Sequence, residues 1–173
     1  IGAQRGSNPN NFSPNPIDYS KPGNAAIPPF RYFAERGVTS AAIVWPAQAD
    51  ARGRGQGYEY DLRQAGITDI STYEVAITET NYVGVAQQIK NDRTQLVVTT
   101  LEISGMARLA QAFQQVGYQP EVPFYGAQAY GPQFLKLAGS AAEGTKLAVT
   151  YSIFEDAPNV PAMATFLDWY RRT

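Results

Sequence analysis

The clearest structural pattern in the chain lies in residues 40–77, SAAIVWPAQADARGRGQGYEYDLRQAGITDISTYEVAI. The segment opens with the apolar run SAAIVW and closes with the β-branched run DISTYEVAI, and both are typical of strands. Between them, Tyr58, Leu62 and Ala65 recur at the spacing of one helix face. We therefore predict a strand, a helix and a second strand, over 40–45, 55–65 and 69–77.

The same alternation continues on both sides of this segment. We predict further helices over 28–37, 82–89, 104–113, 131–139 and 160–172, and further strands over 95–100, 122–126 and 145–153. Ser104 is the predicted cap of its helix and Gly117 its stop. Because strands that alternate with helices pair in parallel, we predict an α/β fold, a doubly wound, mostly parallel five-stranded sheet with helices on both faces.

The first 25 residues differ from the rest in composition. IGAQRGSNPNNFSPNPIDYSKPGNA is rich in Asn, Pro, Gly and Ser, which is typical of irregular structure. We predict that 1–25 form an irregular surface segment or a crossing between domains, and that 26–173 form a single α/β domain. Because the chain starts at Ile1 and shows no leader pattern, we interpret it as a processed or excised piece of something longer.

Charge and composition exclude several classes of function. The 173 residues contain 14 Lys and Arg against 15 Asp and Glu, so no basic field is available for nucleic acid or an anionic membrane. The chain has neither Cys nor His, which excludes disulfides, thiolate nucleophiles, the usual zinc sites and Ser-His-Asp triads. We predict no catalytic residue, no metal and no cofactor.

Three glycines at every second position, Gly53, Gly55 and Gly57, raise the possibility of a phosphate-binding turn. The dinucleotide pattern GxGxxG would need a glycine where Tyr58 stands, and its glycines follow the strand directly. Neither Lys nor Ser/Thr follows to complete a P-loop. We interpret the stretch as a flexible loop whose glycines let the next helix pack closely on the sheet. A nucleotide-dependent, Rossmann-like enzyme domain is the alternative function.

Ligands of open α/β sheets bind beyond the carboxyl ends of the strands, near the point where the strand order reverses. In this chain the predicted ends are residues 45–52, 101–104 and 127–130. We expect polar and aromatic side chains of these segments to converge on a small molecule.

Several segments together resemble the type I periplasmic binding proteins, especially the leucine/isoleucine/valine-binding type. AAIVWPAQADARGRGQGYEYDLRQAGI is similar to that family's apolar strand, "YGRG" or "YGEG" loop and helix ending in "eaGi". NYVGVAQQIKNDRTQLVVTT, ISGMARLAQAFQQVGYQPEVPFYGAQAY and LAGSAAEGTKLAVTYSIFEDAPNVPAMATFLDWYRR are similar to its later segments, in the same order. The resemblance runs from about Phe30 to the end of the chain.

This resemblance implies a function in binding rather than in chemistry. Family members have two α/β lobes that close on a small solute and deliver it to the membrane permease of an ABC importer. The chain matches the second lobe, so we expect a missing first lobe and an upstream signal peptide. The implied location is periplasmic or extracellular in a bacterium, with a membrane-anchored lipoprotein as one form. Ligand-sensing domains of regulators and receptors share this lobe and stay open as an alternative.

The resemblance also implies ligand-binding positions. The loop tyrosine of "YGxG" falls at Arg52, and the ligand-facing position after the third strand falls near Leu101 and Glu102. The acidic residue that holds an α-ammonium in amino-acid binders falls at Gln128, which carries no charge. Glu102 is the implied substitute. The implied ligand is an amino acid, such as a branched-chain one, or a small amide or acid.

Two aromatic residues complete the implied site. Tyr130 follows the fourth predicted strand and offers a stacking face, and Trp45 ends the first strand, where it either lines the base of the cleft or packs in the core.

Overall fold

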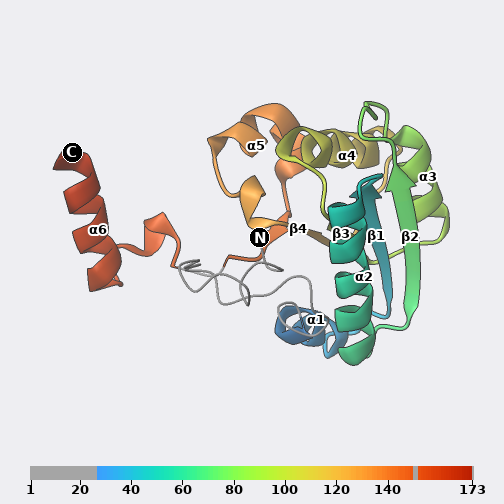
Figure 1. The fold of residues 1–173 in the computed structure, drawn as a ribbon, viewed down its shortest axis with the longest axis horizontal. Coiled ribbons are helices and arrows are strands. Elements are labelled where there is room, and N and C mark those ends of the chain that lie inside the picture. The colour runs from blue at the N-terminus through green and yellow to red at the C-terminus, as the bar shows by residue number, and fades with distance from the viewer. Residues whose placement is uncertain (1–26, 150–151, 173) are drawn as a thin grey trace.

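The computed structural model describes residues 27–149 and 152–172 (Figure 1). Its strands are β1 (Ser40–Pro46), β2 (Asp69–Val75), β3 (Leu96–Thr99), β4 (Val122–Tyr125) and β5 (Lys146–Leu147). They form one parallel sheet in the order β2-β1-β3-β4-β5. The predicted doubly wound α/β sheet of five strands is therefore confirmed, and its strand order reverses between β1 and β3.

Helices cover both faces of the sheet. The helices are α1 (Ile27–Ala34), α2 (Ala49–Gln64), α3 (Val83–Asn91), α4 (Ile103–Gln115), α5 (Pro132–Ala138) and α6 (Pro161–Arg172), with 3-10 turns η2 (Ala127–Ala129), η3 (Gly139–Ala142) and η4 (Phe154–Asp156). Residues of α1 and α2 share one buried cluster, and residues of α3, α4 and α5 share the other. Along β1, Ile43 and Trp45 belong to the first cluster and Ala42 and Val44 to the second, as the alternation of a strand requires.

The glycine-rich stretch is helical, which corrects our prediction of a loop. Helix α2 begins at Ala49, six residues before the predicted start, and contains Gly53, Gly55 and Gly57. Ala51 and Leu62 are buried, so packing against the sheet offsets the low helix propensity of the glycines. Gly55 faces the ring of Trp45, where an added Cβ would lie 2.2 Å from Cε3. The predicted close packing of this helix on the sheet is thus present. The glycine that permits it, Gly55, is part of the helix and not of a preceding loop.

Other boundaries also differ from prediction, and two of them bear on the site and the sheet. Helix α4 begins at Ile103 with Glu102 in the capping position, so Ser104 lies inside the helix and is not its cap. Strand β5 pairs only at Lys146 and Leu147, opposite Phe124 and Tyr125. Among the described residues of the predicted range 145–153, the strand is short because β5 is an edge strand whose one neighbour, β4, ends at Tyr125. The predicted segment 1–25 lies outside the described residues.

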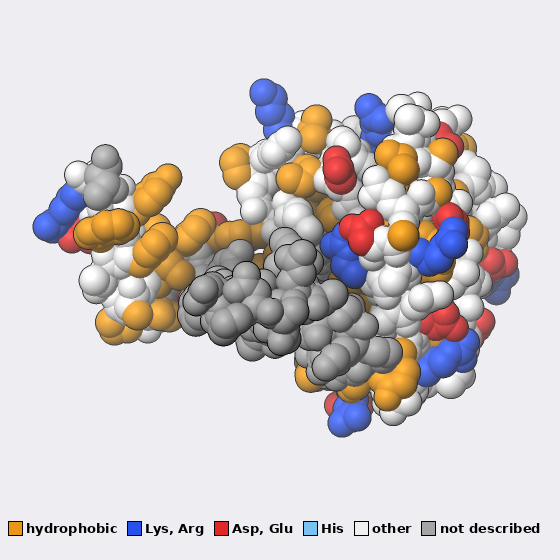
Figure 2. All heavy atoms as spheres, viewed as in Figure 1, with side chains coloured by type: hydrophobic (Ala, Val, Ile, Leu, Met, Phe, Trp, Pro, Cys, Tyr) orange, Lys and Arg blue, Asp and Glu red, His pale blue; other side chains and the backbone are white. Residues whose placement is uncertain are grey.

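Helix α6 stands apart from the sheet and its covering helices (Figure 1). None of its residues is buried, and its main packing partner is the adjacent turn η4. Exposed fractions are 47% for Phe166, 63% for Trp169 and 66% for Tyr170. Figure 2 shows apolar side chains gathered over this helix. The apolar side chains of the predicted helix 160–172 therefore lie largely on the surface of the described structure.

Candidate functional site

A cavity of about 380 Å³ lies at the carboxyl ends of β1, β2 and β3, next to the point where the strand order reverses. The segments that follow these three strands line it, together with the first turns of α2 and α4. The lining residues are Pro46, Gln48, Asp50, Arg54, Ala76, Ile77, Thr78, Glu79, Thr80, Tyr82, Thr100, Leu101, Glu102, Ser104, Gly105 and Arg108. This is the location that the fold favours for a ligand.

The wall after β2 is shaped by Glu79. Its carboxylate accepts hydrogen bonds from the backbone N–H groups of Thr80, at 2.8 Å, and Asn81, at 2.7 Å. The Asn81 side chain in turn accepts from the N–H of Val83 at the start of α3. These bonds hold the connection between β2 and α3 in one conformation, so the hydroxyls of this wall are presented by an ordered loop.

The wall after β3 depends on Thr99. Its hydroxyl donates to the carbonyl of Val44 at 2.9 Å and accepts from the N–H of Leu101 at 3.0 Å. This pair of bonds ties β3 to β1 and directs the chain away from the sheet, so that Thr100, Leu101 and Glu102 line the cavity. The Thr100 hydroxyl is buried and has no hydrogen-bond partner among the described residues.

The third wall is the start of α4 with Tyr82 packed against it. Tyr82 is only 4% exposed, yet its ring lines the cavity. The Tyr82 hydroxyl lies 3.1 Å from the place that a Cβ on Gly105 would occupy. Burial raises the pKa of Tyr82, nearby Glu79 adds to that rise, and the Arg108 charge opposes it. The phenol therefore keeps its proton at neutral pH and is a hydrogen-bond donor.

Both signs of charge are present around the cavity. Arg54 lies 3.7 Å from Asp50 one helical turn away, a long and exposed ion pair of small energetic weight. Arg108 makes no ion pair among the residues that the structure describes, 27–149 and 152–172. Glu102 occupies the N-cap position of α4 without a capping bond from its side chain. The cavity can thus offer both cationic donors and anionic acceptors to a ligand.

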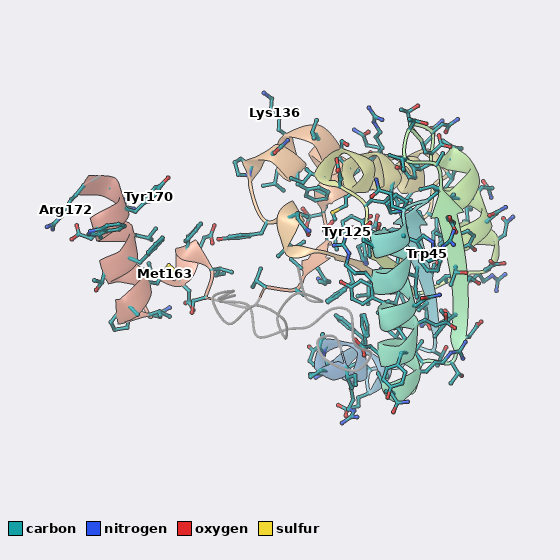
Figure 3. All side chains as sticks on the ribbon, viewed as in Figure 1. Trp45, Tyr125, Lys136, Met163, Tyr170 and Arg172 are labelled. Carbon is teal, nitrogen blue, oxygen red and sulfur yellow. The ribbon has the colours of Figure 1, made fainter. Side chains whose placement is uncertain are left out.

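Of the six residues implied by resemblance, Leu101 and Glu102 line the cavity. Trp45 is not among the lining residues: its ring packs in the core beneath Gly55 of α2 (Figure 3). Arg52 points to the sheet edge, where its guanidinium lies 2.5 Å from the Glu74 carboxylate. That hydrogen bond is the main reason why the pKa of Glu74 lies below its ordinary value.

The other two implied residues lie after β4, and neither lines this cavity. Gln128 is exposed in η2. The Tyr130 hydroxyl donates to the Glu155 carboxylate and accepts from the N–H of Phe154 at 3.0 Å. The bond from Tyr130 holds the pKa of Glu155 below its ordinary value. Through these two hydrogen bonds, Tyr130 links η4 to the segment that follows β4.

Sequence reasoning did not single out Tyr82, Arg54 or Arg108. Tyr82 begins the helix predicted over 82–89, and its side chain belongs to a buried core cluster. Arg108 follows Ser104 by four residues in the same helix, so helical spacing places the two on one face. That spacing was available in the sequence as a signal for Arg108.

The described residues hold no cluster of three or more His, Cys, Asp or Glu side chains suited to a metal ion. No described helix is long and apolar enough to cross a bilayer.

Comparison with known proteins gives a consistent result. A profile of the family described as "Periplasmic binding protein" matches residues 3–173. No curated protein sequence shows a significant match. Among solved structures, a leucine binding protein from Thermotoga maritima superposes with a TM-score of 0.69 and 15% identity over 84% of this chain and 41% of that protein.

Two other solved structures are similar. A branched-chain amino acid ABC transporter from Thermus thermophilus with bound valine has a TM-score of 0.69 and 16% identity over 90% of this chain and 39% of its own. A fatty acid ABC transporter substrate-binding protein from Thermomonospora curvata has a TM-score of 0.67 and 16% identity over 84% of this chain and 38% of its own. At these identities the likeness establishes the fold. The chain spans 38% to 41% of the length of the three proteins.

Proposed function

Because this chain belongs to the periplasmic binding protein family, we propose that it is one lobe of an extracytoplasmic solute-binding protein serving an ABC importer. The role is binding and delivery without chemical change of the solute. The proposed partners are the solute, a first lobe of the same protein and a membrane permease.

The observation that carries this proposal is the cavity at the carboxyl ends of β1, β2 and β3. Its lining combines hydroxyls, guanidinium groups and carboxylates with apolar side chains such as Leu101. It also lies at the place where the strand order reverses, which open α/β sheets use for ligands. One lobe supplies half a cleft in this arrangement, and closure of a second lobe over the cavity would complete it.

We propose that the solute is an amino acid or a small amide or acid. The structurally similar proteins include a leucine binding protein, one with bound valine and one described for fatty acids. Glu102 lines the cavity, and its side chain makes no capping hydrogen bond to α4. Its carboxylate is therefore available to an ammonium group of the solute. Gln128 remains a proposed polar contact outside this cavity, reachable by a longer solute or in the closed form.

The exposed apolar face of helix α6 is a second reason to propose that a first lobe exists. Its apolar face contains Phe166, Leu167 and Tyr170, and with Phe154 it forms an exposed apolar surface. Exposed apolar patches of this kind mark surfaces that pack against another body. Since the similar proteins are more than twice as long as this chain, we propose that the remaining lobe covers α6.

A thermal-shift screen of amino acids, their amides and small organic acids on the longest natural form of the protein tests the function. A true ligand raises Tm, and above Kd the rise grows with the logarithm of the ligand concentration. For a ligand with an ammonium group, we expect Glu102→Gln to weaken binding roughly tenfold, because one charge-assisted hydrogen bond is lost. Glu143→Gln, an exposed change outside the cavity, is the matched control.

Two results would contradict the proposal. One is the absence of any Tm rise with these solutes; the other is a rise with nucleotides, which would favour the Rossmann-like enzyme alternative. Deletion of the gene in the host distinguishes transport from sensing, since a transport component is required for uptake of its solute.

A further inference from the structure

We propose that Tyr82, the first turn of α4 and Arg108 form a subsite for the carboxylate of the solute. The inference rests on the proposed function and narrows it, because such a subsite selects acids over neutral amides.

The first observation is the position of the Tyr82 hydroxyl. The side chain is 4% exposed and lines the cavity, so the phenol group reaches the cavity from within the core. The hydroxyl makes no hydrogen bond within the described ranges 27–149 and 152–172. The Tyr82 hydroxyl is therefore an available donor at the cavity wall, and a ligand oxygen at this point would accept its hydrogen bond.

The second observation is the free start of α4. This helix has 13 residues, and the Glu102 side chain at its N-cap makes no capping bond. The first backbone bond runs from the N–H of Met106 to the carbonyl of Glu102, so the N–H groups of 103–105 precede the helical ladder. Ser104 and Gly105 both line the cavity. Helix starts of this kind bind anions through these N–H groups and the helix dipole.

Gly105 lets the Tyr82 hydroxyl and the helix start meet. A Cβ at this position would lie 3.1 Å from both the Tyr82 hydroxyl and the Leu101 Cβ. Without that Cβ, the phenol oxygen lies directly against the first turn of α4. The donor of the side chain and the donors of the backbone are therefore adjacent.

The third observation is the unpaired cation Arg108. Two arginines line the cavity, Arg54 and Arg108; Arg54 lies within ion-pair distance of Asp50, whereas Arg108 has no such carboxylate partner among the described residues. Arg108 and Tyr82 line the same cavity. Arg108 lies one turn after Ser104 on the same face of α4.

These groups fit a carboxylate better than an amide. A carboxylate accepts charge-assisted hydrogen bonds from a guanidinium, and such bonds are about twice as strong as neutral ones. The nearby Glu79 is already held by two backbone N–H groups, so it does not need Arg108 as a partner. Glu102 lies at the N-cap end of the same turn, where it can face the ammonium of an amino acid.

The test is a titration of the 173-residue chain with acetate and with acetamide, followed by backbone amide NMR at constant ionic strength in chloride. We expect acetate to shift the amides of 103–105, and acetamide to leave them unchanged. Arg108→Gln should weaken acetate binding about tenfold and Tyr82→Phe roughly threefold. Arg63→Gln, whose guanidinium pairs with Glu59 away from the cavity, should bind acetate like the parent chain.

Equal shifts with acetate and acetamide, or equal affinity in the parent chain and Arg108→Gln, would overturn the subsite. In each variant, unchanged spectra of the remaining residues show that the fold is retained. If acetate binds here but no solute stabilises the longer protein, the proposed function fails and the subsite stands. If leucine and leucinamide bind the longer protein equally well, the proposed function stands and the subsite fails.

Discussion

The contact between Gly55 and Trp45 determines how closely α2 approaches the sheet. An added Cβ on Gly55 would lie 2.2 Å from Cε3 of the indole and 2.7 Å from Cζ3, far inside van der Waals contact. Gly53, two residues earlier in the same helix, faces open space. Glycines that look equivalent in the sequence therefore have different roles, and only Gly55 is required for packing.

We predict that Gly55→Ala lowers the free energy of unfolding by roughly 1–3 kcal/mol, because the methyl group must displace the Trp45 ring or the helix. Gly53→Ala is the matched control and should raise that free energy by about 0.5–1 kcal/mol, the usual gain of alanine over glycine in a helix. Urea unfolding followed by circular dichroism measures both. Equal stabilisation by the two substitutions would contradict the packing role of Gly55.

Tyr125 carries a buried hydroxyl that has no hydrogen-bond partner among the described residues. We predict that Tyr125→Phe is neutral or stabilises the protein by up to about 1 kcal/mol, because an unsatisfied polar group leaves the core. Tyr118→Phe is the matched comparison: its hydroxyl donates to the carbonyl of Thr94 at 2.8 Å, so its loss should cost about 1 kcal/mol. Chemical denaturation at neutral pH distinguishes the two.

The same residue predicts a pH dependence. Burial raises the pKa of Tyr125 above its ordinary value of 10.0, so above that pH the folded state holds a proton that the unfolded state has lost. Stability therefore falls as the pH rises above about 10. Tyr125→Phe should reduce this slope, and an unchanged slope would show that other groups produce it.

Among the helices, α6 differs most from the rest in its packing. An isolated helix of 12 residues is marginal in water, and no residue of α6 is buried. Figure 3 shows Met163 and Tyr170 on this helix, away from the body of the molecule. By contrast, α4 buries seven of its residues, Gly105, Met106, Ala107, Leu109, Ala110, Ala112 and Phe113.

We predict that the backbone amides of α6 exchange rapidly with deuterium in this chain, while those of α4 are protected. In the proposed two-lobe protein, α6 should become protected because its apolar face is covered. Phe166→Ser should change the stability of this chain by less than about 0.5 kcal/mol and destabilise the longer protein. Strong protection of α6 in this chain alone would contradict the proposed docking.

Sequence periodicity predicted the elements well where they are amphipathic or continuously apolar. Strands β1, β3 and β4 and the central part of α4 follow directly from such patterns. The start of α2 did not, because glycine propensity argues for a loop and only burial against Trp45 reverses it. The length of β5 was also missed, since it depends on where the neighbouring strand ends.

For the molecule as a whole, the arrangement of the sheet explains the candidate site. Parallel strands bring their carboxyl ends to one edge, so segments that follow β1, β2 and β3 meet there although they are distant in sequence. The family resemblance located Leu101 and Glu102 at this edge, and both line the cavity. Whether any of the six implied residues contacts a solute remains a prediction.

Periodicity was enough to predict an α/β sheet, and the absence of Cys and His excludes disulfides, thiolate nucleophiles and Ser-His-Asp triads within this chain. These properties depend on neighbours along the chain or on total composition, so the amino-acid sequence alone determines them. The cavity with Tyr82 and Arg108, the helical state of the glycines and the exposed face of α6 depend on the folded chain. They arise because burial and close approach are properties of neighbours in space, which a periodic pattern along the chain does not specify.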